Sequence, residues 1–253
     1  MSLLTDPMFY AVALPAVALT GLSKGGFQGA ALLSLPLLSL VMHPIQAAAI
    51  MLPVLMFQDV FTVAAFRKTV DWTMLWLLAP GVLIGTGIGW ATATIVTADH
   101  IRLLVGLIAF VFTLNAVLRR GIGAAGKAHN RIEAGFWGMV SAFTSFLVHA
   151  GGPPFSIYAL PRRLTPEVLA GTSAVFFMAV NWLKVPPYLA LGQLSWETLV
   201  LSVVLFPMAA AANVAGIWMV RRIEMGLFYK ILYALLLLVS VKLIYDGTVG
   251  LLG

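Results

Sequence analysis

Two glycine-rich stretches, each carrying one ionisable side chain, contain the residues of this sequence best suited to chemistry. The first is Ser23–Gly26 (SKGG), and the second is His149–Pro154 (HAGGPP). Each interrupts a long apolar segment, and their glycines lie about 126 residues apart, near half the chain length. Glycines expose backbone N–H groups, which bind anions where a helix begins. We therefore interpret the two stretches as the paired centre of a membrane transporter.

Lys24 is the candidate cation of the first stretch. Its ammonium is costly near mid-membrane unless it is paired, hydrated or matched by an anion. Helices that begin near Phe27 and at Pro153 would aim their positive N-termini at the same place, since proline suits a first helical turn. Two helix N-termini and one lysine make an anion site. The alternative is that Lys24 snorkels to the membrane surface and the glycines only allow close packing.

His149 is the candidate proton carrier of the second stretch. Histidine exchanges a proton in the physiological range, as proton-coupled transport requires. Thr144 and Ser145 precede it and could line the same side of the chain. The alternative is a packed, hydrogen-bonded histidine. Ser145 and His149 could also share a helix face in an intramembrane hydrolase, but no acid or oxyanion arrangement accompanies them, so we expect no enzyme.

Asp59, Asn181 and Lys184 lie within other long apolar segments. Ionisable groups inside a membrane usually have partners and a function. We therefore expect Asp59 and Lys184 to neutralise each other across the two halves of the chain. Such a pair would serve either the structure or, together with His149 and Asn181, proton coupling.

The composition of the chain is that of a membrane protein. Of its 253 residues, 61% are hydrophobic and only 9% are charged, with a mean hydropathy of +1.01. A soluble domain carries about 25% charged residues, so this chain could not solvate a globule of its size. Cysteine is absent, and so are the P-loop and HExxH motifs. We expect no cofactor, no metal and no nucleic-acid partner, and we assign the net charge of +6 to basic loops.

The apolar residues form long segments, several of about 20 residues, which is enough to cross about 30 Å of hydrocarbon. The segments 135–148 and 153–161 are too short to cross. We therefore expect an all-α polytopic membrane protein with about eight full transmembrane helices plus broken or re-entrant hairpins. The segments, up to ten in number, are 7–23, 27–42, 45–66, 73–93, 100–118, 135–148, 153–161, 167–190, 196–220 and 227–247.

Basic residues sort the connections between these segments into two sets. The turns at 41–44, 94–99 and 191–194 carry no lysine or arginine. The positive-inside rule places the basic connections in the cytoplasm, so both termini are predicted to be periplasmic. The basic residues are Arg67, Lys68, Arg119, Arg120, Lys127, Arg131, Arg162, Arg163, Arg221 and Arg222.

The two halves of the chain resemble each other at a nearly constant offset of 122 to 127 residues. This regularity predicts an internal repeat within one membrane domain, 1–253, with halves 7–120 and 135–247 joined by a cytoplasmic linker, 121–134. Asp71 would lie inside and its counterpart Ser195 outside, so the repeats are expected to be inverted, as in many secondary transporters.

The segment pairs that contain the two glycine stretches each begin and end on one side of the membrane. Two full crossings would satisfy this pattern, and so would a hairpin that dips to mid-depth and returns. We favour re-entrant or broken hairpins whose tips meet near the midplane, because the return arm 153–161 is only about half a membrane thickness long. Irregular backbone at that depth must be buried or line a cavity.

Taken together, these stretches resemble the TauE/SafE sulfite exporter family over nearly the whole chain. The similarity is carried by Gly21–Gly29 (GLSKGGFQG), Phe143–Pro154 (FTSFLVHAGGPP) and Lys184–Gln193 (KVPPYLALGQ). Many relatives have glycine where Gln28 stands, so this side chain could alter the tip or add a donor. The resemblance implies a proton-coupled permease of the bacterial cytoplasmic (inner) membrane for sulfite, sulfoacetate or a related organosulfonate.

We therefore expect two inverted halves to give alternating access to a central anion site, with proton exchange on His149 or Asp59 driving release. Export is expected from the resemblance only. An anion channel without proton coupling, uptake, a non-transporting scaffold and a homodimer stay open. The residues expected to bind the anion are Lys24, Gly25, Gly26 and Gln28 at one tip, and Thr144, Ser145, His149, Gly151 and Gly152 at the other.

Overall fold

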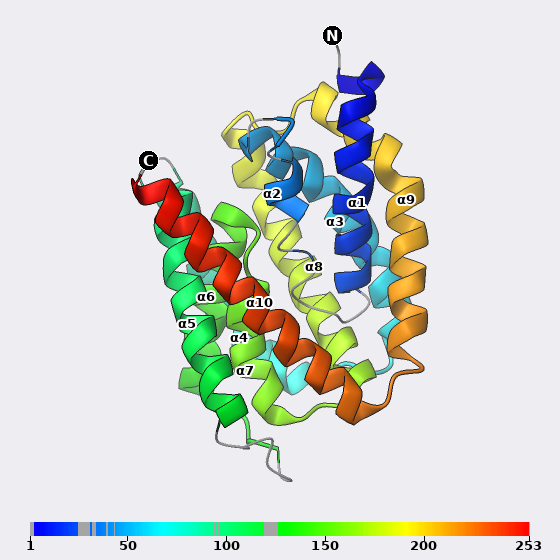
Figure 1. Cartoon of the computed structure of the whole chain (residues 1–253). Helices are drawn as coiled ribbons and strands as arrows, with labels where there is room; N and C mark the ends of the chain where they lie inside the picture. Colours follow the sequence, from blue (N-terminus) through cyan, green and yellow to red (C-terminus); the bar gives the residue numbers. More distant parts are fainter. Residues whose placement is uncertain are drawn as a thin grey trace.

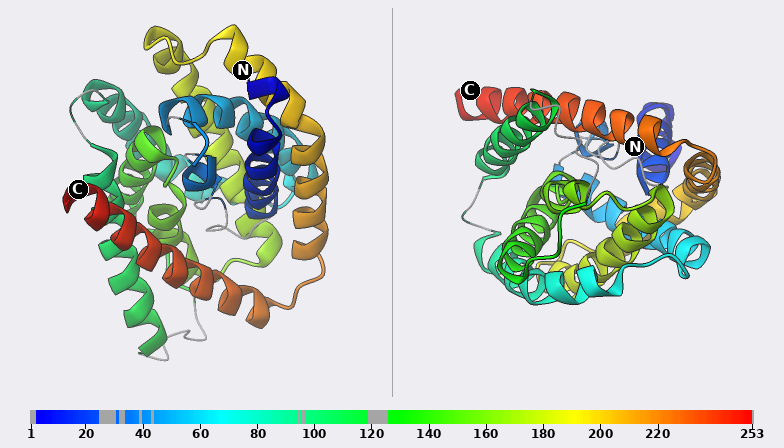
Figure 2. Two further views of the ribbon diagram at one scale, coloured as in Figure 1. Left: turned by 45° about the horizontal axis from the view of Figure 1, so that its top comes forward. Right: turned by 90° about the horizontal axis from the view of Figure 1, so that it is seen from below.

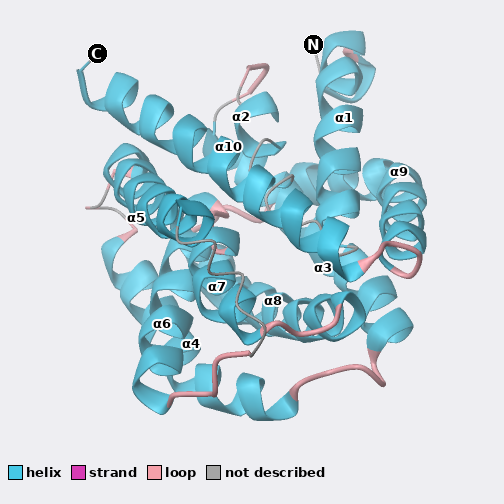
Figure 3. Cartoon of the chain, turned by 60° about the horizontal axis from the view of Figure 1, so that its bottom comes forward, coloured by secondary structure: helices cyan, strands magenta, loops and turns pink. Residues whose placement is uncertain are grey.

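The computed structural model describes most of the chain as helices joined by short connections. Within the described residues there is no strand (Figure 3). Gly25, Gly26 and Gln28, three of the residues expected at the first tip, lie outside the described residues. The described residues are 3–24, 31, 34–38, 40–42, 44–93, 95, 97–118 and 126–252.

The helices follow the order of the apolar segments along the chain. One short 3₁₀ turn, Leu3–Thr5, precedes the first helix, and another, Leu160–Arg162, follows the helix that ends at Ala159. The helices are α1 (Pro7–Lys24), α2 (Ser34–Leu38), α3 (Pro44–Phe66), α4 (Trp72–Thr92), α5 (Ala98–Leu118), α6 (Arg131–Val148), α7 (Gly152–Ala159), α8 (Pro166–Ala190), α9 (Trp196–Val220) and α10 (Met225–Leu252).

Five of the described helices, α3, α4, α8, α9 and α10, are long and apolar enough to cross a membrane. They expose large apolar side chains, such as Trp76 at 74% and Leu238 at 68%, as a lipid-facing surface does. The all-α, multi-pass class is therefore confirmed. Eight crossings and an inverted repeat stay predictions.

Close helix pairs hold the bundle together through small residues. A Cβ on Gly85 of α4 would overlap the Met139 carbonyl of α6, and one on Gly138 of α6 would lie 2.6 Å from the Leu78 oxygen. A Cβ on Gly21 of α1 would likewise lie 2.5 Å from the Ala212 Cβ of α9. Glycine at these positions lets two backbones approach each other, as in other membrane helix pairs.

Two further pairs complete the arrangement of the long helices. α3 packs against α8 in the middle of the molecule, and α5 packs against α10 at its side. Figure 2 shows α10 lying along the outside of the bundle beside α5. Each of these two pairs thus joins a helix of one half of the chain to a helix of the other half.

The two chain ends lie at one end of the molecule, toward the top of Figure 1, and the basic connections lie at the other. Contacts tie these connections together: Arg221 donates to the Ala65 carbonyl at 2.9 Å, and Thr69 donates to the Glu167 carbonyl at 3.3 Å. The described basic connections that contain Arg67, Arg162 and Arg221 thus share one side, as the charge pattern predicts. Which side faces the cytoplasm stays a prediction.

α6 begins at Arg131, inside the stretch 121–134 that the sequence assigns to the linker. The reason is a helix cap, because the Asn130 side chain accepts the Glu133 N–H at 3.0 Å. These first residues are polar and so do not belong to an apolar segment. The helix therefore extends beyond the part that hydropathy marks.

α6 and α7 form a hairpin that enters and leaves at the basic end of the molecule. Lys127 N–H donates to the Pro161 carbonyl at 2.9 Å, which brings the two ends of the hairpin together. α7 has 8 residues and so extends about 12 Å, which is too short to cross a bilayer. At the tip, His149 adopts the left-handed conformation with φ 51° and caps α6. The turn is thus held by a non-glycine residue in a conformation that side chains seldom adopt.

Candidate anion-binding site

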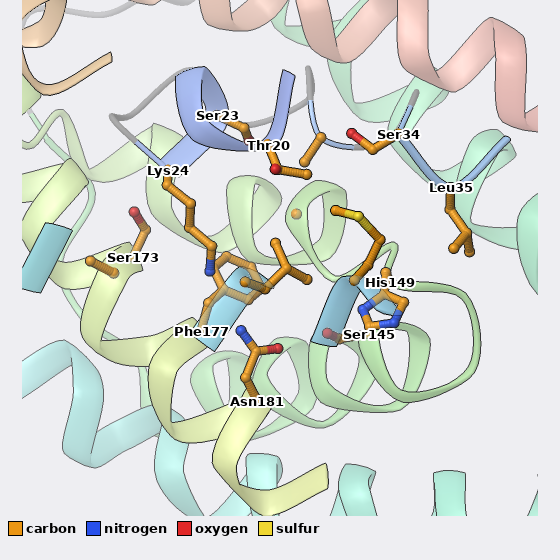
Figure 4. A pocket seen from close by; sticks show the side chains of 15 residues that line it. Thr20, Ser23, Lys24, Ser34, Leu35, Ser145, His149, Ser173, Phe177 and Asn181 are labelled. Carbon is orange, nitrogen blue, oxygen red and sulfur yellow. The ribbon is translucent and has the colours of Figure 1, made fainter. Parts of the chain in front are cut away.

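A pocket lies where the C-terminal ends of α1 and α6 meet the middle of α8 (Figure 4). α1 reaches it from the end that holds the chain termini, and α6 from the basic end. Its volume is about 80 Å³, room for several waters or one small anion. The polar residues that line it are Thr20, Ser23, Lys24, Ser34, Ser145, His149, Ser173 and Asn181; Gly152 and Phe177 line it as well.

Lys24, the last residue of α1, extends into this pocket (Figure 4). Its Nζ forms an ion pair with Asp59 of α3, and it lies 5.5 Å from the centre of the Phe177 ring. The Lys24 side chain is 11% exposed and the Asp59 side chain 0%. Lys24 therefore does not snorkel to a surface. The negative end of the α1 dipole also favours its charge there.

Asp59 and Lys184 form no direct ion pair among the described residues, although their charges attract each other at longer range. Asp59 uses one carboxylate oxygen for Lys24 and the other for the Asn181 amide, at 2.8 Å. The Asn181 oxygen in turn accepts from Lys184 Nζ at 3.4 Å. Asn181 thus separates the two charged groups. The sequence could not anticipate this, because Lys24 arrives from a helix 35 residues away in the chain.

Lys184 is fully buried, at 0% exposure, and lies behind the pocket wall against Ser145 and His149. Its Nζ donates to Ser145 Oγ at 2.7 Å and lies 3.4 Å from His149 Nδ1 and from Asn181 Oδ1. Within the described chain these contacts are all to neutral groups. When both lysines carry a proton, this site therefore holds two cations and one carboxylate.

His149 links Lys184 to the pocket. Its Nδ1 faces Lys184, and its ring packs edge-on against Tyr188 with centroids 6.5 Å apart. The other ring nitrogen, Nε2, is buried and forms no well-aligned hydrogen bond with a described residue, although the Ala48 backbone lies near the ring. A ligand in the pocket would therefore share this nitrogen with the Ala48 backbone.

Several residues of the second tip hold the hairpin instead of facing the pocket. The Thr144 hydroxyl lies 3.1 Å from the Ala150 carbonyl, and a Cβ on Gly151 would lie 2.7 Å from the Ser141 oxygen. Gly152 does line the pocket, and a Cβ there would meet nothing within 4 Å. Pro153 and Pro154 have no N–H, so the start of α7 has fewer donors than the sequence argument assumed.

Sequence reasoning named Asn181 but missed Ser173 and Phe177 of α8 and the hydroxyls of Thr20 and Ser34. Ser173, Phe177 and Asn181 recur every four residues and so share one helix face with Lys184. That spacing was a usable signal. No comparable pattern marks Thr20 or Ser34. The Thr20 hydroxyl donates to the Val17 carbonyl of its own helix, and the Ser34 hydroxyl donates to the Ala16 carbonyl of α1.

The family model described as "Sulfite exporter TauE/SafE" matches residues 13–243, nearly the whole chain. The chain belongs to the TauE/SafE sulfite exporter family. No curated protein and no solved structure matches it. Membership in the TauE/SafE family confirms the resemblance seen in the two glycine stretches, and it identifies a membrane permease of a transporter family.

Proposed function

We propose that this protein is a secondary transporter that moves sulfite, or a related sulfur oxyanion or organosulfonate, across the bacterial inner membrane. One observation carries the proposal: Lys24 lines the pocket, Lys184 lies directly behind its wall, and Asp59 is the one carboxylate among the described residues that pairs with either of them, all three largely removed from solvent. Two buried cations beside one anion leave one positive charge uncompensated, which is costly in a low-dielectric setting. A small anion in the pocket would offset that charge.

Asp59 supplies a route to proton coupling. An anion that binds Lys24 must compete with Asp59, which already holds the Lys24 ammonium and is itself fully buried. A proton taken up by the Asp59 carboxylate removes the competitor and frees Lys24. Anion and proton then occupy the site together, and loss of the proton restores the ion pair and expels the anion. His149 is the other ionisable group that lines this pocket.

Two inverted halves would give this site alternating access. The helix pairs support that arrangement if α1 to α5 correspond in order to α6 to α10. The α1–α9 pair then corresponds to the α6–α4 pair, and α3 and α5 pack against their own counterparts, α8 and α10. α1 and α6 also reach the pocket from opposite ends of the molecule (Figure 1). Rocking of the halves would expose the pocket to each side in turn.

The orientation that fits the positive-inside rule has the basic connections in the cytoplasm and both termini in the periplasm. Export, the direction in the family's name, then means that the anion and its proton enter together from the basic side, so that the anion gradient drives export against the inward proton gradient. The basic residues there, including Arg67, Lys68 and Arg221, would attract anions toward the entrance.

Sulfite flux from proteoliposomes with and without an imposed pH gradient tests this function. We expect gradient-driven flux in the wild type and its loss in Lys24→Ala. Since that variant leaves Asp59 buried without a partner, the double variant Lys24→Met/Asp59→Asn removes both charges and should also be inactive while folded. Lys230→Ala, on the exposed face of α10, is the matched control and should transport normally.

Flux that is indifferent to the gradient in every variant would instead indicate a channel, and Lys24 would lose its assigned role. No flux of sulfite, sulfoacetate or thiosulfate in the wild type would contradict the transport proposal itself.

A further inference from the structure

We propose that Lys184 is a positioning residue that turns Ser145 and His149 into hydrogen-bond donors, so that the pocket selects anions with acceptor oxygens over zwitterionic sulfonates. This inference rests on the proposed function, because it concerns the same pocket. Lys184 does not line the pocket; it acts from behind the wall through the two residues that do.

The Lys184 ammonium has three hydrogen-bond acceptors around it. An ammonium has three donors and no acceptor. At 2.7 Å from Ser145 Oγ and 3.4 Å from His149 Nδ1, it obliges both of these atoms to act as acceptors. Asn181 Oδ1, at 3.4 Å, is the third acceptor. All three protons of the ammonium are thus directed to named atoms.

The second step follows for Ser145. A hydroxyl has one donor and two lone pairs. Because its oxygen receives the Lys184 proton, the Ser145 O–H is left to donate elsewhere, and Ser145 lines the pocket. The serine therefore presents its hydrogen, and not only its lone pairs, to a ligand.

The third step follows for His149. A neutral imidazole carries its proton on one nitrogen and accepts at the other. When Nδ1 accepts from Lys184, the proton lies on Nε2, which is the buried nitrogen without a well-aligned partner. His149 thus has Nε2–H as a donor, which the nearby Ala48 backbone and an anion in the pocket would share. In this arrangement the histidine is a neutral ligand-binding group, and Asp59 is left as the proton carrier.

The resulting pocket favours one chemical class of sulfur compound. Lys24 Nζ, Ser145 O–H and His149 Nε2–H all donate, which suits sulfite or methanesulfonate. A zwitterion such as taurine would bring a further ammonium into a site that already has two. The carboxylate next to the pocket, Asp59, is occupied by Lys24 and Asn181. An unpaired buried charge of this kind is an effective basis for rejection.

The experiment uses the purified full-length protein and the substitution Lys184→Met, which keeps the approximate length and removes the donors. In proteoliposomes we expect the KM for sulfite to rise about tenfold or more, since hydrogen bonds to charged groups are the strong ones. The preference for methanesulfonate over taurine in competition should fall by a similar factor. Lys230→Met is the matched control and should change neither quantity.

Thermal unfolding separates this role from a structural one. A buried ammonium without a carboxylate in direct contact carries a large desolvation cost, which a methionine does not carry. We therefore expect Lys184→Met to unfold at the same or a higher temperature without anion, and to gain less stability from added sulfite. A purely structural lysine would show the reverse, with a lower unfolding temperature and an unchanged anion response.

Ser145→Ala provides a second test that does not depend on the lysine variant folding. It should also raise the KM for sulfite, and adding it to Lys184→Met should cost little more, because both changes remove the same donor. Ser240→Ala, a buried serine of α10 outside the pocket, is its control.

A folded Lys184→Met protein with the wild-type KM and the wild-type discrimination against taurine would overturn the inference and leave the transport proposal standing. The same holds if Ser145→Ala has no effect on the KM. Absence of sulfite transport in the wild type would instead refute the proposed function.

Discussion

Replacing Asp59 by Asn tests the ion pair at the centre of the site. The substitution keeps the shape of the side chain and its contact with Asn181 but removes the charge that holds Lys24. Both partners are largely buried, with side-chain exposures of 0% for Asp59 and 11% for Lys24. Removing one partner of a buried pair costs about 3–5 kcal/mol, so the anion-free protein should be strongly destabilised.

The same substitution should strengthen anion binding. An anion in the pocket no longer meets the Asp59 charge, and at an effective dielectric of about 20 a repulsion across roughly 4–8 Å amounts to about 2–4 kcal/mol. This corresponds to roughly a 30- to 1,000-fold gain in affinity. Added sulfite should therefore restore much of the lost stability, because it binds only the folded protein.

The assay is thermal unfolding of the detergent-solubilised protein over a series of sulfite concentrations, followed by flux with and without a pH gradient. Asp246→Asn is a matched control, since Asp246 pairs with Lys242 on α10 at 2.7 Å but with side chains 19% and 39% exposed. That pair should contribute at most about 1 kcal/mol. An Asp59→Asn protein as stable as the wild type, with no sulfite response and with flux still driven by the gradient, would refute the reasoning.

Three further predictions concern the pocket wall, the helix packing and the orientation. Gly152→Ala adds a methyl group where nothing lies within 4 Å, so unfolding should be unchanged while the KM for sulfite rises several-fold. Gly85→Ala should lower the stability by about 1–3 kcal/mol because its Cβ overlaps α6, whereas Gly87→Ala, with open space around its Cβ, should not; urea or thermal unfolding compares the two. The chain has no cysteine, so a single introduced cysteine reports its own side of the membrane to an impermeant thiol reagent. Leu194→Cys should react in intact cells, where the periplasmic side is accessible, and Arg163→Cys should react in inverted vesicles, where the cytoplasmic side is accessible.

The sequence alone determined the membrane class, the helix segments and the family. Long apolar runs and sparse charges have one physical solution in lipid, which is a helix that satisfies its own backbone. The same reading located the second tip, and Lys24, Ser145, His149 and Gly152 line one pocket, while their binding of an anion stays a prediction. Such features are local, so hydropathy and residue type suffice to find them.

Only the tertiary structure decided which groups meet. Lys24 pairs with Asp59, while Lys184 turns to Ser145 and His149, because α1 and α6 end beside α8 at the same depth. Periodicity shows which residues share one face of a helix. Which other helix packs against that face depends on the tertiary structure, and close contacts at glycines such as Gly85 and Gly138 help to set how the helices pack. The balance of charges in the site is therefore a property of the fold.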